Sequence, residues 1–433
     1  MPRSSAKPLT FIDAFAGCGG LSLGLMQAGW IGRFAIERDK FAFATLKANL
    51  LAKGSPHKYV WPRGLPKEPI GIVELLSKYR DQLERVSRNV DVLVGGPPCQ
   101  GFSSAGRRKH DDPRNQLFDS YLNLVDIIKP KAVLIENVRG FTLDFNTGNE
   151  VKNFSQALKA RLSDSYTVYE RLLDLSMFGV PQRRTRYFVL AFRSEINVPD
   201  PFAHLQSRLP SFLRSLQLTA PVSSGTAISD LEVGRNGTQP STESKGFEET
   251  RYAGPLTRYQ RLMNAGCKVP TDLRLARHAE DIADRFKEII ELSHAEGRLN
   301  TSIGAEMRAR FGLKKTALRV LDPDRPSPTI TSMPDDLLHY SEPRTLTVRE
   351  NARLQTFPDW YSFQGKYTTG GYLRKQEVPR FTQVANAVPP LVARAIGETL
   401  TDLLRIKPTT TAARDPKLRS PLHGVQQSAE VHA

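Results

Sequence analysis

The chain of 433 residues exceeds the usual size of one domain, and its 39% hydrophobic content is enough for a sizeable core, so we expect two packed units. It has no run of about 18 uncharged apolar residues and no apolar signal-peptide core, so we expect no membrane span. Its three cysteines are too few for a disulfide scaffold and favour the reducing cytoplasm. The 61 basic and 45 acidic residues give a net charge of +16, which favours a polyanionic partner such as nucleic acid, although a charge that only aids solubility would look the same.

The first half of the chain alternates β-rich runs with helical patterns, which is typical of a parallel α/β sheet. We expect strands at residues 9–15, 34–36, 90–94, 132–135, 167–173 and 186–192. We expect helices at residues 21–28, 39–50, 118–128 and 151–162. This order predicts a doubly wound, Rossmann-like fold.

Beyond about residue 195 the pattern changes. Residues 223–245 are rich in Ser, Thr and Gly and predict a mobile loop. Residues 273–292 show helical periodicity, and further helices are expected at 348–356 and 390–406. The composition beyond residue 407 is typical of a disordered tail.

A glycine-rich turn follows the first expected strand and reads Asp-Ala-Phe-Ala-Gly-Cys-Gly-Gly from Asp13 to Gly20. Glycines let a ligand approach the backbone, and the next helix offers its positive N-terminal end. Such a turn alone often only reverses the chain. Glu37 at the end of the second strand can accept hydrogen bonds from ribose hydroxyls, and the two features together indicate a nucleoside cofactor.

A second loop, Gly95-Gly96-Pro97-Pro98-Cys99-Gln100, follows the strand expected at 90–94, where open α/β sheets place ligands. A lone cysteine is more often a small buried apolar residue than a nucleophile. The flanking Gly and Pro pairs make a buried strand continuation a poor interpretation, so we predict that Cys99 is exposed to a ligand.

Two further groups follow later strands. Glu136 comes after the strand expected at 132–135, so it can share a pocket with Cys99; the alternative is a solvated loop residue.

Arg184 and Arg186 are two residues apart and would project from the same face of a strand. On this motif alone, a surface charge cluster is at least as good an interpretation as phosphate or base binding.

In this order, the motifs resemble those of the cytosine-5 DNA methyltransferase family, of the bacterial restriction–modification type. The resemblance continues through Arg349-Glu350-x-x-Arg353-Leu354-Gln355-Thr356-Phe357-Pro358-Asp359 and ends in Asn386-Ala387-Val388-Pro389. Two positions depart from the family pattern: the stretch 69–72 lacks the acidic residue that contacts the adenine of the cofactor, and Ala385 stands where Gly is usual.

The resemblance implies that Cys99 adds to C6 of cytosine, Glu136 hydrogen-bonds or protonates N3, Arg186 holds O2 and Arg184 supports the cysteine loop. It implies S-adenosylmethionine as the cofactor, with S-adenosylhomocysteine as its product, and no metal. The implied cofactor-binding residues are Phe15, Gly17, Gly19, Gly20, Leu21, Glu37, Pro97, Leu117 and Asn386.

The resemblance further implies an S-adenosylmethionine-dependent methyltransferase domain in two parts, 1–195 and 344–406, around an inserted target-recognition domain, 196–343, before the tail at 407–433. The partner would be double-stranded DNA with its target base flipped out of the helix, and the protein would be a monomer. A cognate restriction endonuclease could act separately. Our candidate DNA contacts are Arg107, Arg108 and Lys109, in a lid after the nucleophile, and Arg308, Arg310, Lys314 and Lys315.

Three alternatives stay open at this point. RNA cytosine-5 methylation would use the same fold and cofactor. A catalytically inactive DNA-binding relative would usually lack the nucleophile or its supporting groups, all of which are present here. A nucleotide-dependent oxidoreductase would leave the Pro-Cys-Gln loop without a purpose.

Overall fold

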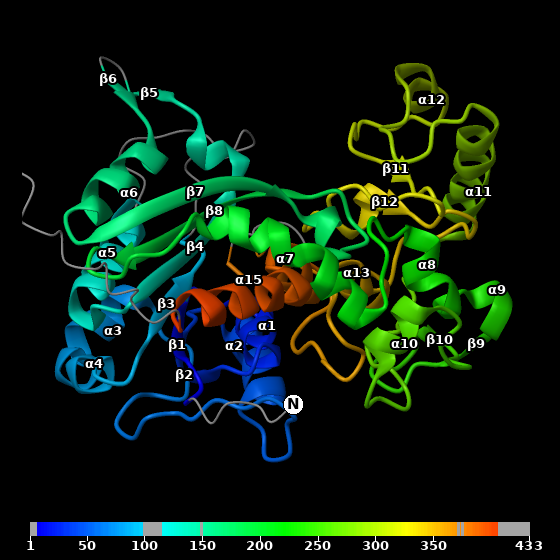
Figure 1. Ribbon diagram of the computed structural model, residues 1–433. Helices are drawn as coiled ribbons and strands as arrows, with labels where there is room; N and C mark the ends of the chain where they lie inside the picture. The colour runs from blue at the N-terminus through cyan, green and yellow to red at the C-terminus, as the bar shows by residue number, and fades with distance from the viewer. Residues whose placement is uncertain (1–6, 98–114, 148–149, 370–372, 374–375, 406–433) are drawn as a thin grey trace, which may run out of the picture.

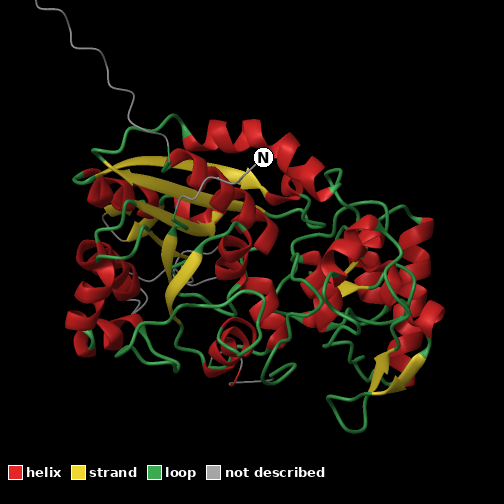
Figure 2. Cartoon of the chain, turned by 60° about the horizontal axis from the view of Figure 1, so that its bottom comes forward, coloured by secondary structure: helices red, strands yellow, loops and turns green. Residues whose placement is uncertain are grey.

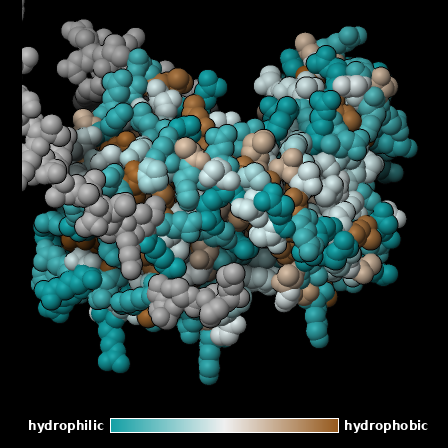
Figure 3. Space-filling model, in the orientation of Figure 1, coloured by the Kyte–Doolittle hydropathy of each residue, from teal (hydrophilic) through white to brown (hydrophobic). Residues whose placement is uncertain are grey.

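The computed structural model describes residues 7–97, 115–147, 150–369, 373 and 376–405. A part built on one large sheet lies beside a smaller, mainly helical part (Figure 1). Figure 2 shows helices on both sides of that sheet. In the space-filling view, a notch separates the part that carries the sheet from the part that carries helices α11 (Glu280–Ala295) and α12 (Ala305–Arg310) (Figure 3).

The sheet has six strands in the order β2-β1-β3-β4-β8-β7. Four are parallel: β1 (Thr10–Ala14), β2 (Ile31–Ile36), β3 (Val92–Gly95) and β4 (Ala132–Val138). The last two, β7 (Tyr166–Asp174) and β8 (Thr185–Arg193), are antiparallel to their neighbours. The predicted doubly wound fold is confirmed, but the sheet is mixed, because the connection from β7 to β8 is too short for a crossover helix.

Alternate residues of the strands face two different cores, since successive side chains point to opposite faces. Phe11 faces the core shared with α1 (Gly20–Gln27), α2 (Lys40–Leu50), α7 (Pro201–Leu216) and α15 (Pro390–Leu403). Ile12 faces the core shared with α3 (Ile72–Lys78), α4 (Arg80–Ser87), α5 (Asn115–Ile128) and α6 (Phe154–Ser163). The helices therefore cover both faces.

Helix α15 returns from the far end of the sequence to pack against α1 (Figure 1). A side chain at Gly24 would overlap Pro390 and Ala393, so glycine allows the two helices to lie unusually close. This contact brings residues near the C-terminal end beside the glycine-rich turn.

The second part of the structure has a small core of its own, around Phe286, Ile290 and Met307. Its remaining elements are α8 (Ser224–Ile228), η3 (Ser229–Leu231), α9 (Val233–Asn236), β9 (Thr238–Pro240), β10 (Glu248–Thr250), α10 (Arg258–Asn264), β11 (Arg319–Val320), η4 (Pro334–Asp336) and β12 (Leu337–Leu338). Helix α7, which lies within the predicted insertion, packs instead against α15. The division at 1–195, 196–343 and 344–406 stays a prediction, and the tail at 407–433 lies outside the described residues.

Several sequence predictions were wrong in detail. The expected mobile loop at 223–245 contains α8, η3, α9 and β9, and its first helix is capped by the Ser223 hydroxyl, which accepts from the Thr226 amide at 3.2 Å. The helix expected from 151 begins at Phe154, because 150–152 form a strand (β6) paired with β5 (Phe145–Thr147). The helix expected from 273 begins at Glu280. Glu136, which was expected after the fourth strand, lies within β4.

The family-like stretch from Arg349 to Asp359 lies in the interior, mostly on α13 (Val348–Leu354), next to α14 (Arg380–Asn386). Arg353 has no exposed surface and donates to Asp359 at 2.6 and 2.7 Å and to Asp230 at 3.0 and 3.1 Å. One guanidinium thus joins the C-terminal part of the chain to the inserted segment.

Removing this buried cation should be costly, because two buried carboxylates would lose their partner. We expect Arg353→Met to lower the free energy of unfolding by about 3–5 kcal/mol, measured by urea denaturation. The control is Arg161→Ala, which breaks a half-exposed pair with Asp126 and should cost no more than about 1 kcal/mol. Equal losses in the two variants would contradict a structural role for the Arg353 cluster.

Candidate active site

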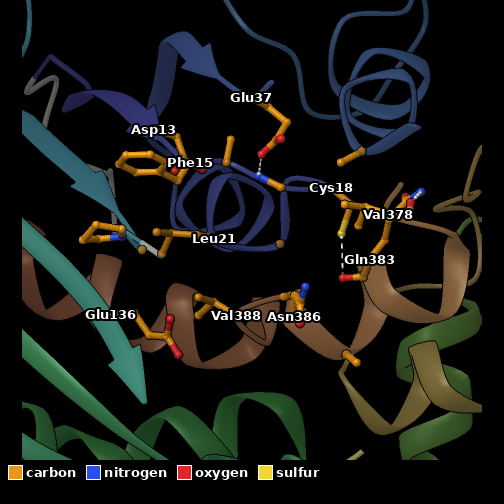
Figure 4. Close-up of a pocket in the computed structure, with 18 of the residues that line it drawn as sticks. Asp13, Phe15, Cys18, Leu21, Glu37, Glu136, Val378, Gln383, Asn386 and Val388 are labelled. Carbon is orange, nitrogen blue, oxygen red and sulfur yellow. Dashed lines mark hydrogen bonds between the residues drawn. The ribbon is translucent and has the colours of Figure 1, made fainter. Parts of the chain in front are cut away.

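A cavity of about 450 Å³ opens at the carboxyl ends of β1, β2, β3 and β4. In Figure 4, Glu37 from the end of β2, Glu136 from β4 and Asn386 from the end of α14 lie around the start of α1. The cavity brings together most of the predicted site residues: Phe15, Gly17, Gly20, Leu21, Glu37, Pro97, Leu117, Glu136, Arg184, Arg186 and Asn386. Gly19 does not line it.

The glycine-rich turn needs its glycines for two reasons. Gly17 and Gly19 have positive φ values of 57° and 92°, which L side chains rarely adopt. Gly20 lies so close to the Val388 carbonyl that a side chain would overlap it. The turn therefore presents its backbone to the cavity and lets the C-terminal segment approach.

The Glu37 carboxylate is held in place by the backbone. It accepts hydrogen bonds from the amides of Gly17 at 2.9 Å and Asp39 at 2.7 Å. Burial raises the pKa of Glu37, and these two amides oppose that effect. The carboxylate is thus fixed at the edge of the cavity with lone pairs left to accept from a ligand hydroxyl.

Asp13 is a second buried carboxyl group of the cavity, and the sequence analysis did not single it out. It accepts from the Ser22 hydroxyl through one oxygen, while Oδ1 has no hydrogen-bond partner among the described residues. Burial raises the pKa of Asp13 to about 7, against the lowering effect of Ser22. Its place in the glycine-rich motif was a signal that could have identified it.

One end of the cavity is apolar. Phe15, Ile36, Ile70, Ile72 and Leu117 line it, and this is where the expected acidic residue is absent. Gly71 there forms the N-cap of α3 with open space around it. An apolar slot beside a fixed carboxylate suits a flat base attached to a sugar, so the described residues fit a nucleoside cofactor.

Glu136 of β4 and Arg186 of β8 form an ion pair on a diagonal between the two strands. Arg186 Nε lies 3.1 Å from Glu136 Oε1, and both side chains are mostly buried. Burial raises the pKa of Glu136, while Arg186 and Arg184 lower it. The net effect is a carboxyl group that holds a proton more readily than an ordinary glutamate.

Arg184 is nearly fully buried, so it is not part of a surface charge cluster. It donates to the Ala385 carbonyl at 2.9 Å, and its Nε has no partner among the described residues. Burial and the charge of Arg186 lower the pKa of Arg184 to about 9. A cation at this position favours negative charge in the cavity.

The loop that carries the predicted nucleophile is only partly described. Asn137 donates to the Pro97 carbonyl at 3.0 Å, and Pro97 lines the cavity. Cys99 and the predicted lid residues Arg107, Arg108 and Lys109 lie outside the described residues.

The inserted segment also reaches the cavity, through Ile330, Thr331 and Ser332. The same segment carries the basic stretch 298–319, which contains the predicted DNA contacts Arg308, Arg310, Lys314 and Lys315. Within that stretch, Arg310 pairs with Glu288, Lys315 with Asp335 and Asp336, and Arg308 donates to the Ile303 carbonyl. Lys314 is exposed. Their role in DNA contact stays a prediction.

Within the described ranges, no cluster of three or more His, Cys, Asp or Glu side chains could hold a metal ion. None of the helices in the same ranges is long and apolar enough to cross a membrane.

Comparison with known proteins gives a consistent result. Residues 9–402 match the family model described as C-5 cytosine-specific DNA methylase. The chain is 30% identical over 401 residues to the type II methyltransferase M.DdeI of Desulfomicrobium norvegicum, covering 90% of this chain and 88% of that one. It is also 30% identical over 410 residues to the type II methyltransferase M.XorII of Xanthomonas oryzae pv. oryzae, covering 92% and 85%.

The fold has a solved counterpart. The structure of a DNA modification methyltransferase encoded within a prophage (E. coli) superposes with a TM-score of 0.60 at 24% identity, covering 92% of this chain and 99% of that one. This similarity supports the Rossmann-like architecture.

Proposed function

The chain belongs to the C-5 cytosine-specific DNA methylase family, and on this premise we propose that it methylates C5 of a flipped-out cytosine in a specific duplex DNA sequence, through a covalent adduct on Cys99. The enzyme is an S-adenosylmethionine-dependent DNA cytosine-5 methyltransferase, and its relatives belong to restriction–modification systems. We further propose that it protects host DNA from a restriction endonuclease.

The observation that carries the proposal is the convergence of two different sets of groups on one cavity. The glycine-rich turn, Glu37 and the apolar slot suit the nucleoside of S-adenosylmethionine. Glu136, Arg184 and Arg186 suit a polar base whose ring gains electrons during the reaction. A cofactor and a target base can therefore share this cavity.

The chemistry assigned to the chain begins at Cys99. Its thiolate adds to C6 of cytosine, and the proton held by Glu136 passes to N3, which generates an enamine at C5. Arg186 holds O2, and the buried Arg184 cation favours the thiolate. S-adenosylmethionine supplies the methyl group that C5 takes up. The C5 proton then passes to a water. Cys99 leaves as the C5–C6 double bond re-forms, and the N3 proton returns to Glu136.

This chemistry needs a base outside the stacked duplex. Flipping costs a few kcal/mol, which phosphate contacts must offset. Residues 201–343, which make up most of the predicted insertion, include 19 basic and 18 acidic residues, so most of the net charge of +16 lies in the rest of the chain. We propose that the catalytic part supplies much of the phosphate attraction.

The proposal is tested by incubating the protein with labelled S-adenosylmethionine and either mixed-sequence duplex DNA or transfer RNA. Label should enter the duplex only, and sequencing of 5-methylcytosine in that DNA should reveal one target sequence. Label in the RNA alone would overturn the proposal and favour RNA methylation.

Glu37→Gln tests the cofactor side of the cavity. The variant loses a charged acceptor for the ribose hydroxyls, and hydrogen bonds to charged groups contribute about 1.5–3 kcal/mol. We expect the KM for S-adenosylmethionine to rise by about 10-fold or more, with little change in kcat at saturation. Steady-state kinetics measures both, and an unchanged KM would remove Glu37 from the cofactor site.

A further inference from the structure

Gln182 and Gln355 are buried next to the cavity and take part in no step of the proposed reaction. Gln182 begins the stretch that contains Arg184 and Arg186, and Gln355 is the C-cap residue that follows helix α13. Both side chains have no exposed surface, and neither lines the cavity. Their amide groups meet in the interior, where Gln182 Nε2 donates to Gln355 Oε1 at 3.2 Å.

Gln182 is hydrogen-bonded to Ile330 of the inserted segment and lies close to Arg184. Its Oε1 accepts from the Ile330 amide at 3.2 Å and lies 3.5 Å from Arg184 Nη1. Ile330 begins the wall of the cavity that the inserted segment contributes. Since Oε1 accepts and Nε2 donates, the orientation of this amide is fixed by its neighbours.

The partners of Gln355 lie on a second part of the cavity wall, which the C-terminal part of the chain contributes. Its Nε2 donates to the Val384 carbonyl at 2.9 Å and to the Ala387 carbonyl at 3.3 Å. These carbonyls flank Asn386, which lines the cavity beside the glycine-rich turn (Figure 4). Arg184 reaches the same stretch through the Ala385 carbonyl.

We propose that Gln182 and Gln355 are positioning residues that couple the two walls, so that the placement of residues 330–332 sets the placement of residues 385–388. The inference rests on the proposed function, in which one cavity holds both cofactor and target base, and it places the first wall at the base and the second, through Asn386, at the cofactor. Gln182 is fully satisfied only when the first wall and Gln355 are in place, and Gln355 only when the second wall and Gln182 are in place. An unsatisfied buried group is costly. The two walls therefore do not move independently.

The coupling is tested with a double-mutant cycle in the full-length protein. Gln182→Ala, Gln355→Ala and the double variant are compared with the wild type for the Kd of S-adenosylhomocysteine, by calorimetry. We expect each single change to weaken binding by about 5- to 30-fold and the double variant to bind no more weakly than the worse single variant, because residues of one network are not additive. The reciprocal readout is the KM for duplex DNA, which Gln355→Ala should also raise.

Gln260 provides a matched control. It is equally buried, donates to Ser229 and accepts from the amides of Leu256 and Thr257, away from the cavity. Gln260→Ala should lower the melting temperature and leave the Kd of S-adenosylhomocysteine within twofold. If an alanine variant of the pair does not fold, the corresponding methionine variant, which preserves side-chain length, takes its place.

Two results would overturn the coupling: effects that multiply in the double variant, or a Gln182 variant that binds S-adenosylhomocysteine as the wild type does. Failure of the wild type itself to bind S-adenosylhomocysteine would instead contradict the proposed function. The two failures are therefore distinguishable.

Discussion

Cys99→Ala is expected to abolish methyl transfer to duplex DNA while leaving the binding of S-adenosylhomocysteine largely intact. Without the thiolate, no group adds to C6, and C5 of cytosine stays too poor a nucleophile to take up a methyl group. The proposed cofactor site is built on Glu37 and the glycine-rich turn, and the Glu37 carboxylate is held there by backbone amides. Label incorporation and calorimetry measure the two properties separately.

Cys267→Ala is the matched control, because Cys267 is a free thiol that does not line the cavity. This variant should methylate DNA at the wild-type rate. Residual turnover by Cys99→Ala at more than a few per cent of wild type would rule out Cys99 as the nucleophile.

Glu136→Gln should produce the second-largest loss, a decrease in kcat of about 10²–10⁴-fold, which is the usual contribution of a positioned proton donor. Glutamine can still donate a hydrogen bond to N3, but it cannot deliver a proton. Burial raises the pKa of Glu136 against the charges of Arg186 and Arg184, so the protonated form persists to higher pH than in an ordinary glutamate. Rising pH removes that proton, and the wild-type kcat should therefore fall as pH passes through this pKa.

The pH profile of kcat separates this role from a structural one. Glu136→Gln should lose the alkaline decline as well as the rate. The control Glu249→Gln changes another buried carboxylate, which accepts from Gln239 and Ser241 outside the cavity. This variant should keep both the wild-type kcat and its decline at alkaline pH. A Glu136→Gln variant with the same decline as the wild type would show that another group titrates there.

The sequence predicted the doubly wound fold and the strand ends that meet at the cavity better than it predicted the elements between them. Strand ends and loops that carry chemistry have strong local patterns, and the cavity contains Glu37, Glu136 and Asn386 as expected. The order of β7 and β8 depends on a short connection whose effect on strand direction has no residue pattern of its own. Helix α7 was not predicted although its apolar residues recur at helical spacing, because Pro210 lies in its interior and proline usually indicates the end of a helix. Helix α3 has only seven residues, too few for a clear periodic pattern.

Residues far apart in sequence explain the remaining differences. Two of the predicted DNA contacts in the stretch 298–319, where Glu306 is the one acid, have acidic partners from outside it. Arg310 pairs with Glu288, and Lys315 pairs with Asp335 and Asp336. Likewise, Arg353 looked like part of a functional motif, yet its contacts with Asp230 and Asp359 lie inside the protein. A sequence window cannot reveal such partners.

The most direct test of the central claim is a trapping experiment with duplex DNA that carries 5-fluorocytosine at the target position. Fluorine cannot leave C5 as a proton does, so a covalent intermediate should accumulate when S-adenosylmethionine is present. Mass spectrometry should find one protein–DNA adduct per duplex, attached at Cys99 and absent from Cys99→Ala. An adduct at another residue, or methylation of normal duplex DNA without any adduct on the fluorinated one, would contradict the proposed mechanism.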